Sequence, residues 1–319
     1  NTSDTETAVC NLASVNLARH IKDGKIDTQK LAKTVKTLMR MLDNVIDLNY
    51  YPSSRAKASN MKHRPVGLGI MGETEASVAC GIAFDSEEGV QFSDEAMELV
   101  SYYAINASME LAKERGAYQT FPGSKWSRGI LPIHTARSKE SRLGEYVWDS
   151  LAQQVAAYGM RNSNTMAIAP TATISTITGT TPCNEPIFEI SRGEKNMSGV
   201  FQVVDPCVRY GRPDLLKTAF EIDPIWVIRK GARRQKWLDQ SQSLNIFVKA
   251  GTKGSQLAEI YMTAWEQGLK TTYYLRSQSK TKAVAPEVKQ AVEAQGDLDK
   301  VVMGANFCSI ENPGCEACQ

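Results

Sequence analysis

The sequence predicts an α/β fold, because short apolar runs typical of buried strands alternate with amphipathic segments typical of helices. The expected strands are 65–70, 164–169, 244–248 and 271–275. Alternation of this kind favours a largely parallel sheet, either open or closed. With 319 residues, 42% of them hydrophobic, the chain can bury the core of one large domain or of two smaller ones.

The expected helices follow from apolar side chains that recur at helical spacing. The clearest example is 31–48, where Leu31, Val35, Leu38, Met39, Leu42 and Ile46 would line one face. A longer helix is expected over 93–115, ending at Gly116 in a left-handed cap. Further helices are expected over 146–158, 255–268 and 286–294.

The charge balance excludes a general electrostatic attraction to nucleic acid or to an anionic membrane, so neither is expected as a partner. Lys plus Arg number 37 and Asp plus Glu number 35, a formal net charge of +2. Any phosphate site must therefore be local. There is no apolar stretch of about 18 residues and no pattern typical of a signal peptide, which predicts a cytoplasmic protein.

The seven cysteines are odd in number and widely spread, unlike a secreted disulfide framework, so most should be free thiols. Cys315 and Cys318 form a closely spaced pair on a polar tail. A zinc site would need four ligands, and only Cys308 lies near, with no histidine downstream. The pair is therefore interpreted as a redox dithiol that exchanges with another disulfide, and no metal site is expected.

Two neighbouring tyrosines, Tyr273 and Tyr274, are the second redox candidate. A phenol can transfer an electron together with a proton, so the tyrosines and the terminal dithiol together suggest radical chemistry. The alternative is that the two rings simply pack in the core.

The segment 67–72 fits the three-glycine dinucleotide fingerprint, and Asp85 lies where the ribose-binding acid would be sought. However, Gly67 and Gly69 fall inside the expected strand, and Gly72 follows directly after it. Close packing of the backbone therefore explains these glycines as well as a nucleotide does.

A strand running into a proline and small hydroxyl residues marks a candidate phosphate loop, made of Pro170, Thr171, Ala172, Thr173, Ile174 and Ser175. Backbone N–H groups and hydroxyls at such a helix start can hold a diphosphate. A capped helix start without a ligand is the alternative. No lysine follows in the P-loop pattern, so ATP hydrolysis is not implied.

Six blocks in order, at 8–17, 64–72, 114–118, 170–175, 239–245 and 272–274, resemble the large catalytic subunit of class I ribonucleotide reductase. The resemblance covers nearly the whole chain. It implies the C-terminal half of a ten-stranded α/β barrel with surrounding helices. Residues 1–296 would be the C-terminal part of the catalytic barrel domain, and 297–319 a flexible redox tail.

The resemblance also implies roles for single residues. Cys10 would be one of two cysteines that reduce the substrate and form a disulfide at each turnover. The loop 170–175 would hold the diphosphate of a nucleoside diphosphate. Tyr273 and Tyr274 would relay a radical from a metal-containing small subunit, so this chain itself would bind no cofactor. Cys315 and Cys318 would reduce the active-site disulfide and be recharged by thioredoxin or glutaredoxin.

The motif Asn-Leu-Cys-x-Glu, which supplies the thiyl-radical cysteine in that family, is absent. In Cys10-Asn11-Leu12 the order is reversed, so Cys10 does not replace it. We therefore expect a divided large subunit whose N-terminal part is a separate companion, and a chain that is inactive alone. Two alternatives stay open: part of a cobalamin-dependent ribonucleotide reductase, and a non-catalytic assembly fragment.

Overall fold

The structure, a computed structural model, describes residues 2–196 and 199–278. These residues form a main unit, 2–190 with 204–278, and a separate hairpin unit. The hairpin pairs β5 (Ser191–Asn196) with β6 (Gly199–Val204). The candidate-site residues that are described all belong to the main unit.

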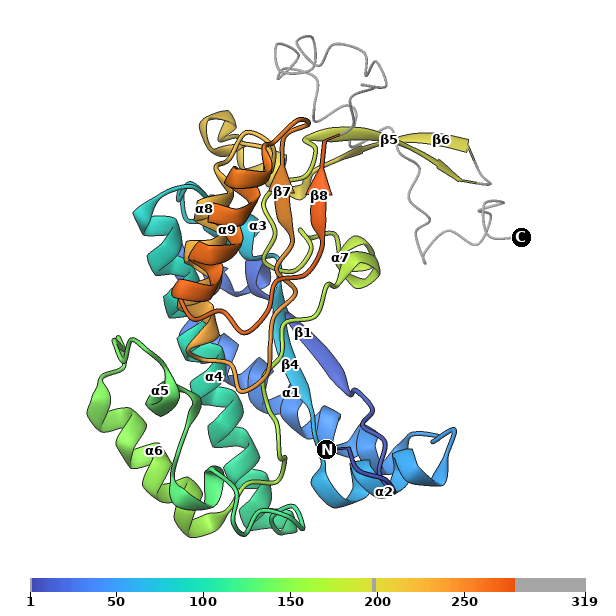
Figure 1. Cartoon of the computed structure of the whole chain (residues 1–319), viewed down its shortest axis with the longest axis vertical. Helices are drawn as coiled ribbons and strands as arrows, with labels where there is room; N and C mark the ends of the chain where they lie inside the picture. The colour runs from blue at the N-terminus through green and yellow to red at the C-terminus, as the bar shows by residue number, and fades with distance from the viewer. Residues whose placement is uncertain (1, 197–198, 279–319) are drawn as a thin grey trace, which may run out of the picture. The chain divides into compact units, whose positions relative to one another are not determined.

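Figure 1 shows the helices of the main unit, several of which were not predicted from the sequence. They are α1 (Thr28–Leu48), α2 (Ser54–His63), α3 (Glu73–Ala79), α4 (Glu87–Arg115), α5 (Pro132–Thr135), α6 (Glu145–Tyr158), α7 (Ala172–Thr178), α8 (Pro224–Gln235) and α9 (Gly254–Glu266), with short 3₁₀ helices at Leu17–His20, Trp126–Arg128, Pro206–Tyr210 and Pro213–Leu215. The predictions for 31–48, 146–158 and 255–268 are confirmed, and 286–294 lies outside the described residues.

The helix predicted over 93–115 has the right end but begins earlier, at Glu87. Its start is set by Ser86, whose side chain accepts a hydrogen bond from the Gly89 N–H, as an N-cap should. The left-handed cap predicted at Gly116 is wrong. Its φ of 83° is positive, but its ψ of 152° lies outside the left-handed helical region.

The strands of the main unit are short: β1 (Leu12–Asn16), β2 (Ile21–Lys22), β3 (Lys25–Ile26), β4 (Gly67–Met71), β7 (Ile246–Val248) and β8 (Leu275–Ser277). β1 and β4 pair in parallel, Leu12 opposite Gly67, and β7 pairs in parallel with β8. Parallel bridges join Leu68 to Met166 and Ile168 to Gln242. A parallel row therefore runs from β1 through β4 and 166–168 to the segment that enters β7.

The α/β class and the parallel pairing are confirmed, apart from the small antiparallel pair β2–β3. Two predicted strands are only partly right. The run 164–169 contributes isolated bridges instead of a continuous strand, and regular pairing at 271–275 begins only at Leu275. The described strands do not close into a barrel.

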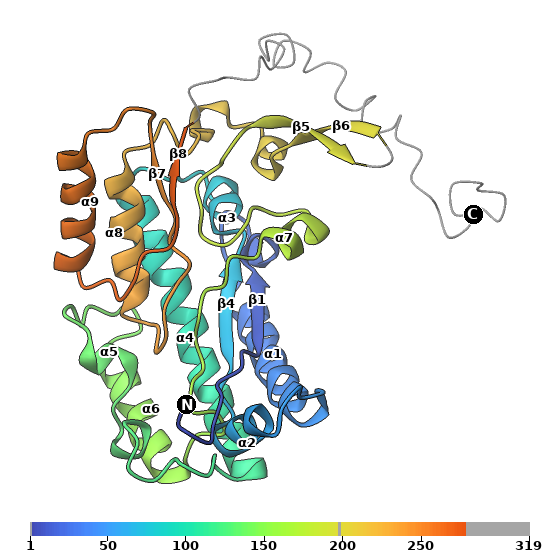
Figure 2. The ribbon, with the colours of Figure 1, turned by 45° about the vertical axis from the view of Figure 1, so that its right-hand side comes forward.

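A layer of helices covers this row. α1 packs on α4, α4 on α8, and α8 on α9, while α1 contacts β1 and α8 contacts β7. Figure 2 shows β1 and β4 side by side, next to α1 and α4. The apolar face predicted for α1 is buried except at Leu38, which is only partly buried against the same core. This layer fixes the strands whose ends carry the candidate site.

The glycines of the apparent dinucleotide fingerprint are explained by packing. A Cβ on Gly69 would overlap the Ala167 carbonyl oxygen and approach the Ile168 Cα to 2.9 Å. Gly72 has a φ of 74°, and a Cβ there would overlap the Thr180 hydroxyl. Asp85, the candidate ribose-binding acid, instead forms an ion pair with Lys217 at 2.7 Å. The protein's own atoms thus fill the space that the glycines leave.

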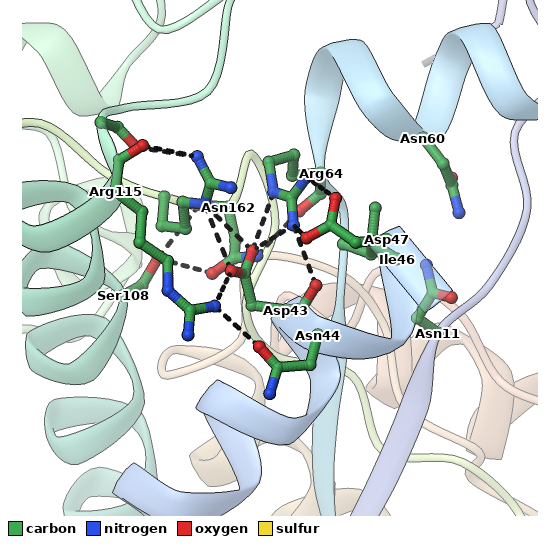
Figure 3. A network of polar contacts seen from close by, with 12 residues as sticks. Asn11, Asp43, Asn44, Ile46, Asp47, Asn60, Arg64, Ser108, Arg115 and Asn162 are labelled. Atoms are coloured by element: carbon green, nitrogen blue, oxygen red, sulfur yellow. Dashed lines mark hydrogen bonds and ion pairs between the residues drawn. The ribbon is translucent and has the colours of Figure 1, made fainter. Parts of the chain in front are cut away.

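A buried charge cluster fixes the start of β4 (Figure 3). The fully buried Asp43 carboxylate accepts hydrogen bonds from Arg64, Arg115 and Arg161, at 2.8, 2.8 and 3.1 Å. Arg64 also binds Asp47 through both of its terminal nitrogens. This guanidinium lowers the pKa of the Asp47 carboxyl. Because Arg64 leads directly into β4, the cluster anchors that strand.

Replacing Asp43 with asparagine should destabilise the chain by about 3–5 kcal/mol, because the three arginines would lose their buried counter-charge. The measurement is the free energy of unfolding from urea denaturation of the purified chain. Asp214→Asn is the matched control, since it removes an exposed carboxylate that pairs with the nearby, exposed Arg212. Equal unfolding midpoints for the two variants would contradict a role for the cluster in stability.

Candidate active site

The two tyrosines lie just before β8 with their ring centroids 4.1 Å apart and their planes inclined at 40°. Neighbouring side chains of a regular strand point to opposite faces, so this contact requires an irregular backbone. Regular pairing indeed starts only at Leu275, although the Tyr273 N–H donates to the Leu244 carbonyl at 2.8 Å. Tyr273 is 46% exposed and Tyr274 55%, so the core-packing interpretation is wrong.

Hydrogen bonding between the two phenols raises the pKa of Tyr273, and partial desolvation acts in the same direction. The Arg276 guanidinium lies 5.6 Å from the centre of the Tyr274 ring and opposes that rise. Tyr273 therefore keeps its proton at neutral pH, and the two phenol rings lie in close contact.

Two polar residues next to the tyrosines were not identified as site residues from the sequence. Asn245, only 3% exposed, accepts a hydrogen bond from the Tyr274 N–H at 3.1 Å and donates one to the Glu185 carboxylate. Burial raises the pKa of Glu185, while the bond from Asn245 and the charge of Arg276 oppose the rise. Asn245 belongs to one of the six blocks, but Glu185 lies in none of them and carried no signal of its own in the sequence.

The predicted phosphate loop leads into α7. Thr171 has a φ of 57°, and its hydroxyl accepts the Cys183 N–H at 2.7 Å instead of capping the helix. The side-chain cap expected in the capped-start alternative is therefore not formed by Thr171. The N–H groups of Ala172, Thr173 and Ile174 have no carbonyl partner within the helix, because they belong to its first turn.

The side chains of the loop divide into two groups. Pro170, Ala172, Thr173 and Ile174 are exposed, whereas Thr171 and Ser175 are buried. The Ser175 hydroxyl donates to the Ala172 carbonyl at 3.1 Å. The exposed part of the loop can thus contact a ligand through its main chain and through Thr173.

A cavity of about 320 Å³ brings this loop together with β1. It is lined by Leu12, Ala13 and Ser14 from the strand and by Ala169 and 171–174 from the loop. Cys10 is not among the lining residues but lies just before β1, and its thiol is exposed. The next residue, Asn11, donates to the Pro65 carbonyl at 3.1 Å, which ties the segment to the start of β4.

Cys10 is the accessible thiol among the four described cysteines, all of which are free. Desolvation raises the pKa of Cys80 to about 11 and raises those of Cys183 and Cys207 further. Such buried thiols are poor nucleophiles. Cys315 and Cys318, predicted as the tail dithiol, lie outside the described residues.

Residues 2–196 and 199–278 contain neither a metal-binding cluster nor a membrane-spanning helix. No three His, Cys, Asp or Glu side chains in this part of the chain are grouped so that they could hold a metal ion. None of its helices combines the length and the apolar character needed to span a membrane.

Comparison with known proteins found a match to the family model described as "Ribonucleotide reductase, barrel domain", over residues 1–211 and 208–275. The chain is 41% identical to the ribonucleoside-diphosphate reductase subunit alpha of Chlamydia trachomatis, covering 100% of this chain and 35% of that protein. The alpha subunit of Helicobacter pylori is 44% identical over 86% of this chain and 35% of its own length. A large chain from Saccharomyces cerevisiae is 35% identical over 92% of this chain and 38% of its own length. The chain thus spans little more than a third of these relatives.

Proposed function

The chain belongs to the family of the ribonucleotide reductase barrel domain, and we propose that it is the C-terminal part of the large subunit of a ribonucleoside-diphosphate reductase. In this role it contributes to the reduction of ribonucleoside diphosphates to deoxyribonucleoside diphosphates by radical chemistry. The observation that carries the proposal is the closely packed, exposed pair Tyr273–Tyr274, because partial exposure leaves the phenols open to a partner that supplies the radical.

The chemistry divides among three groups of residues. The tyrosine pair passes the radical inward, each phenol giving up an electron with its proton and regaining both at the end of the turnover. Cys10 supplies one of the two thiols that reduce the ribose and are oxidised together to a disulfide. The loop 170–175 holds the diphosphate through its first N–H groups and the Thr173 hydroxyl, across the cavity from β1.

The parallel row of strands is proposed to continue, with strands from the N-terminal part of the large subunit, into a ten-stranded α/β barrel. In this arrangement residues 1–296 belong to the barrel domain, and 297–319 form the redox tail with Cys315 and Cys318. The N-terminal part of the large subunit carries the thiyl-radical cysteine. The other partners are a metal-containing small subunit, which supplies the radical, and thioredoxin or glutaredoxin. This chain itself binds no cofactor.

Reconstitution from purified parts tests the proposal. The 319-residue chain, a small subunit and a dithiol reductant should form no deoxynucleoside diphosphate until the N-terminal part of the large subunit, with its Asn-Leu-Cys-x-Glu segment, is supplied. Turnover without that part would contradict the assignment of the chain to the C-terminal part of the subunit, and no turnover with it present would contradict the proposed activity.

A further inference from the structure

Hydrogen bonds join the candidate phosphate loop to the tyrosine pair through one turn, 183–185. On the loop side, the Cys183 N–H donates to the Thr171 hydroxyl at 2.7 Å. On the tyrosine side, the Glu185 carboxylate accepts from the Asn245 side-chain amide. The Asn245 amide oxygen then accepts the Tyr274 N–H at 3.1 Å. The two halves of the candidate site therefore share a single continuous polar connection.

The turn itself is held in an unfavourable conformation. Cys183 has a φ of 48°, in the left-handed region that non-glycine residues adopt rarely and at a cost of about 1–3 kcal/mol. Two contacts hold the turn in addition to the bond between Cys183 and Thr171. The Glu185 carbonyl accepts a hydrogen bond from the Thr74 hydroxyl at 2.5 Å, and the Cys183 thiol lies 3.6 Å from the Ser243 carbonyl. Such a conformation persists only where its surroundings fix it, so the position of Glu185 is set by the loop, by α3 and by the segment before β7.

Asn245 is suited to bridge the two halves because a carboxamide can accept and donate hydrogen bonds at the same time. Its oxygen takes the main-chain N–H of Tyr274, and its nitrogen binds the carboxylate of Glu185. Leucine or aspartate at this position could not do both. The Tyr274 N–H belongs to the irregular stretch that brings the two rings together, so the bond acts on the backbone that determines the ring contact.

We propose that Asn245 and Glu185 are positioning residues that hold Tyr274 against Tyr273 and link this arrangement to the loop 170–175. The proposal rests on the proposed function for what the tyrosines do, and it adds the residues that align them. Neither side chain needs to touch the substrate or carry the radical. Their contribution is to keep the distance between the phenols constant.

The first test replaces Asn245 with leucine in the complete large subunit, assembled with its small subunit. Misalignment of the rings should lower kcat by about 10-fold to 100-fold, with KM for the nucleoside diphosphate nearly unchanged. In ¹³C-tyrosine NMR, the Tyr273 signal, assigned with Tyr273→Phe, should titrate at lower pH than in the wild type, because the bond to Tyr274 that raises the pKa of Tyr273 weakens. Ser243→Ala is the matched control, since the buried Ser243 hydroxyl has no hydrogen-bond partner among residues 2–196 and 199–278.

The second test exchanges the donor and acceptor roles. In Asn245→Asp the new carboxylate still accepts the Tyr274 N–H, but it also faces the Glu185 carboxylate. Arg276 and the Cys183 thiol are further ionisable groups that interact with Glu185. At lower pH the two neighbouring carboxyls can share a proton. As the pH rises from about 6 to about 8 this proton is lost and the two carboxylates repel each other, so kcat relative to wild type should fall. Adding Glu185→Gln supplies an amide donor and should restore kcat at the higher pH.

The outcomes distinguish the positioning role of Asn245 and Glu185 from the radical relay by the tyrosines. A wild-type kcat and an unshifted Tyr273 titration in Asn245→Leu would overturn the positioning role. So would a double variant no more active than Asn245→Asp at about pH 8. If the phenylalanine variants of the tyrosines were instead fully active, the radical relay would fail. A shifted Tyr273 titration in Asn245→Leu would then still support the positioning of the rings.

Discussion

Turnover by the reconstituted reductase should fall by at least about 100-fold when either Tyr273 or Tyr274 is replaced with phenylalanine. Phenylalanine preserves the ring and its packing but removes the hydroxyl, so no phenolic proton can leave together with an electron. With the rings 4.1 Å apart, each phenol is the neighbour that the other needs. The measurement is kcat for deoxynucleoside diphosphate formation, with binding of the nucleoside diphosphate measured separately and expected to stay unchanged.

Tyr50→Phe serves as the control, since Tyr50 is 86% exposed at the end of α1 and far along the chain from the pair. It should keep full activity. Nearly full activity in both Tyr273→Phe and Tyr274→Phe would exclude the relay and favour a cobalamin-dependent reductase, in which the radical arises without tyrosines. Loss of activity in only one of them would mean that the other ring has a structural role.

The sequence predicts best those parts of the fold that are determined by residues close together in the chain. The sequence predicts the helix 31–48 because the apolar side chains that recur at helical spacing are also the ones that pack in the core. The segment 164–169 was harder, because its apolar residues form only isolated bridges, with the distant partners Leu68 and Gln242. The early start of α4 depends on a single N-cap, Ser86, which lies outside the apolar pattern used to find the helix.

The candidate site shows the same division. Tyr273, Tyr274 and Cys10 could be named from motifs, and the need for an irregular backbone at the tyrosines followed from strand geometry alone. Glu185 could not be found in this way, because its role arises from a hydrogen bond to Asn245, 60 residues away. Contacts of this kind exist only after the chain has folded, so they leave no local pattern in the sequence.

Replacing Cys10 with serine should abolish repeated turnover, with a loss of about 100-fold or more in steady-state rate. A hydroxyl cannot be oxidised to a disulfide, so the two electrons that the ribose requires would have no source at this position. The exposed thiol just before β1 and the cavity shared by β1 and the phosphate loop are consistent with that role. Product formation should be followed in the same reconstituted assembly, together with the number of free thiols before and after substrate is added.

Cys80→Ser is the matched control, because Cys80 is half-buried and its pKa of about 11 keeps it protonated and unreactive. The control should lose two thiols per turnover to a disulfide, as the wild type does, whereas Cys10→Ser should lose none when substrate is added without reductant. Full turnover by Cys10→Ser would instead identify the chain as a non-catalytic assembly fragment. In that case the exposure of the Cys10 thiol would reflect only its place ahead of an edge strand, because a scaffold has no use for electrons from a cysteine.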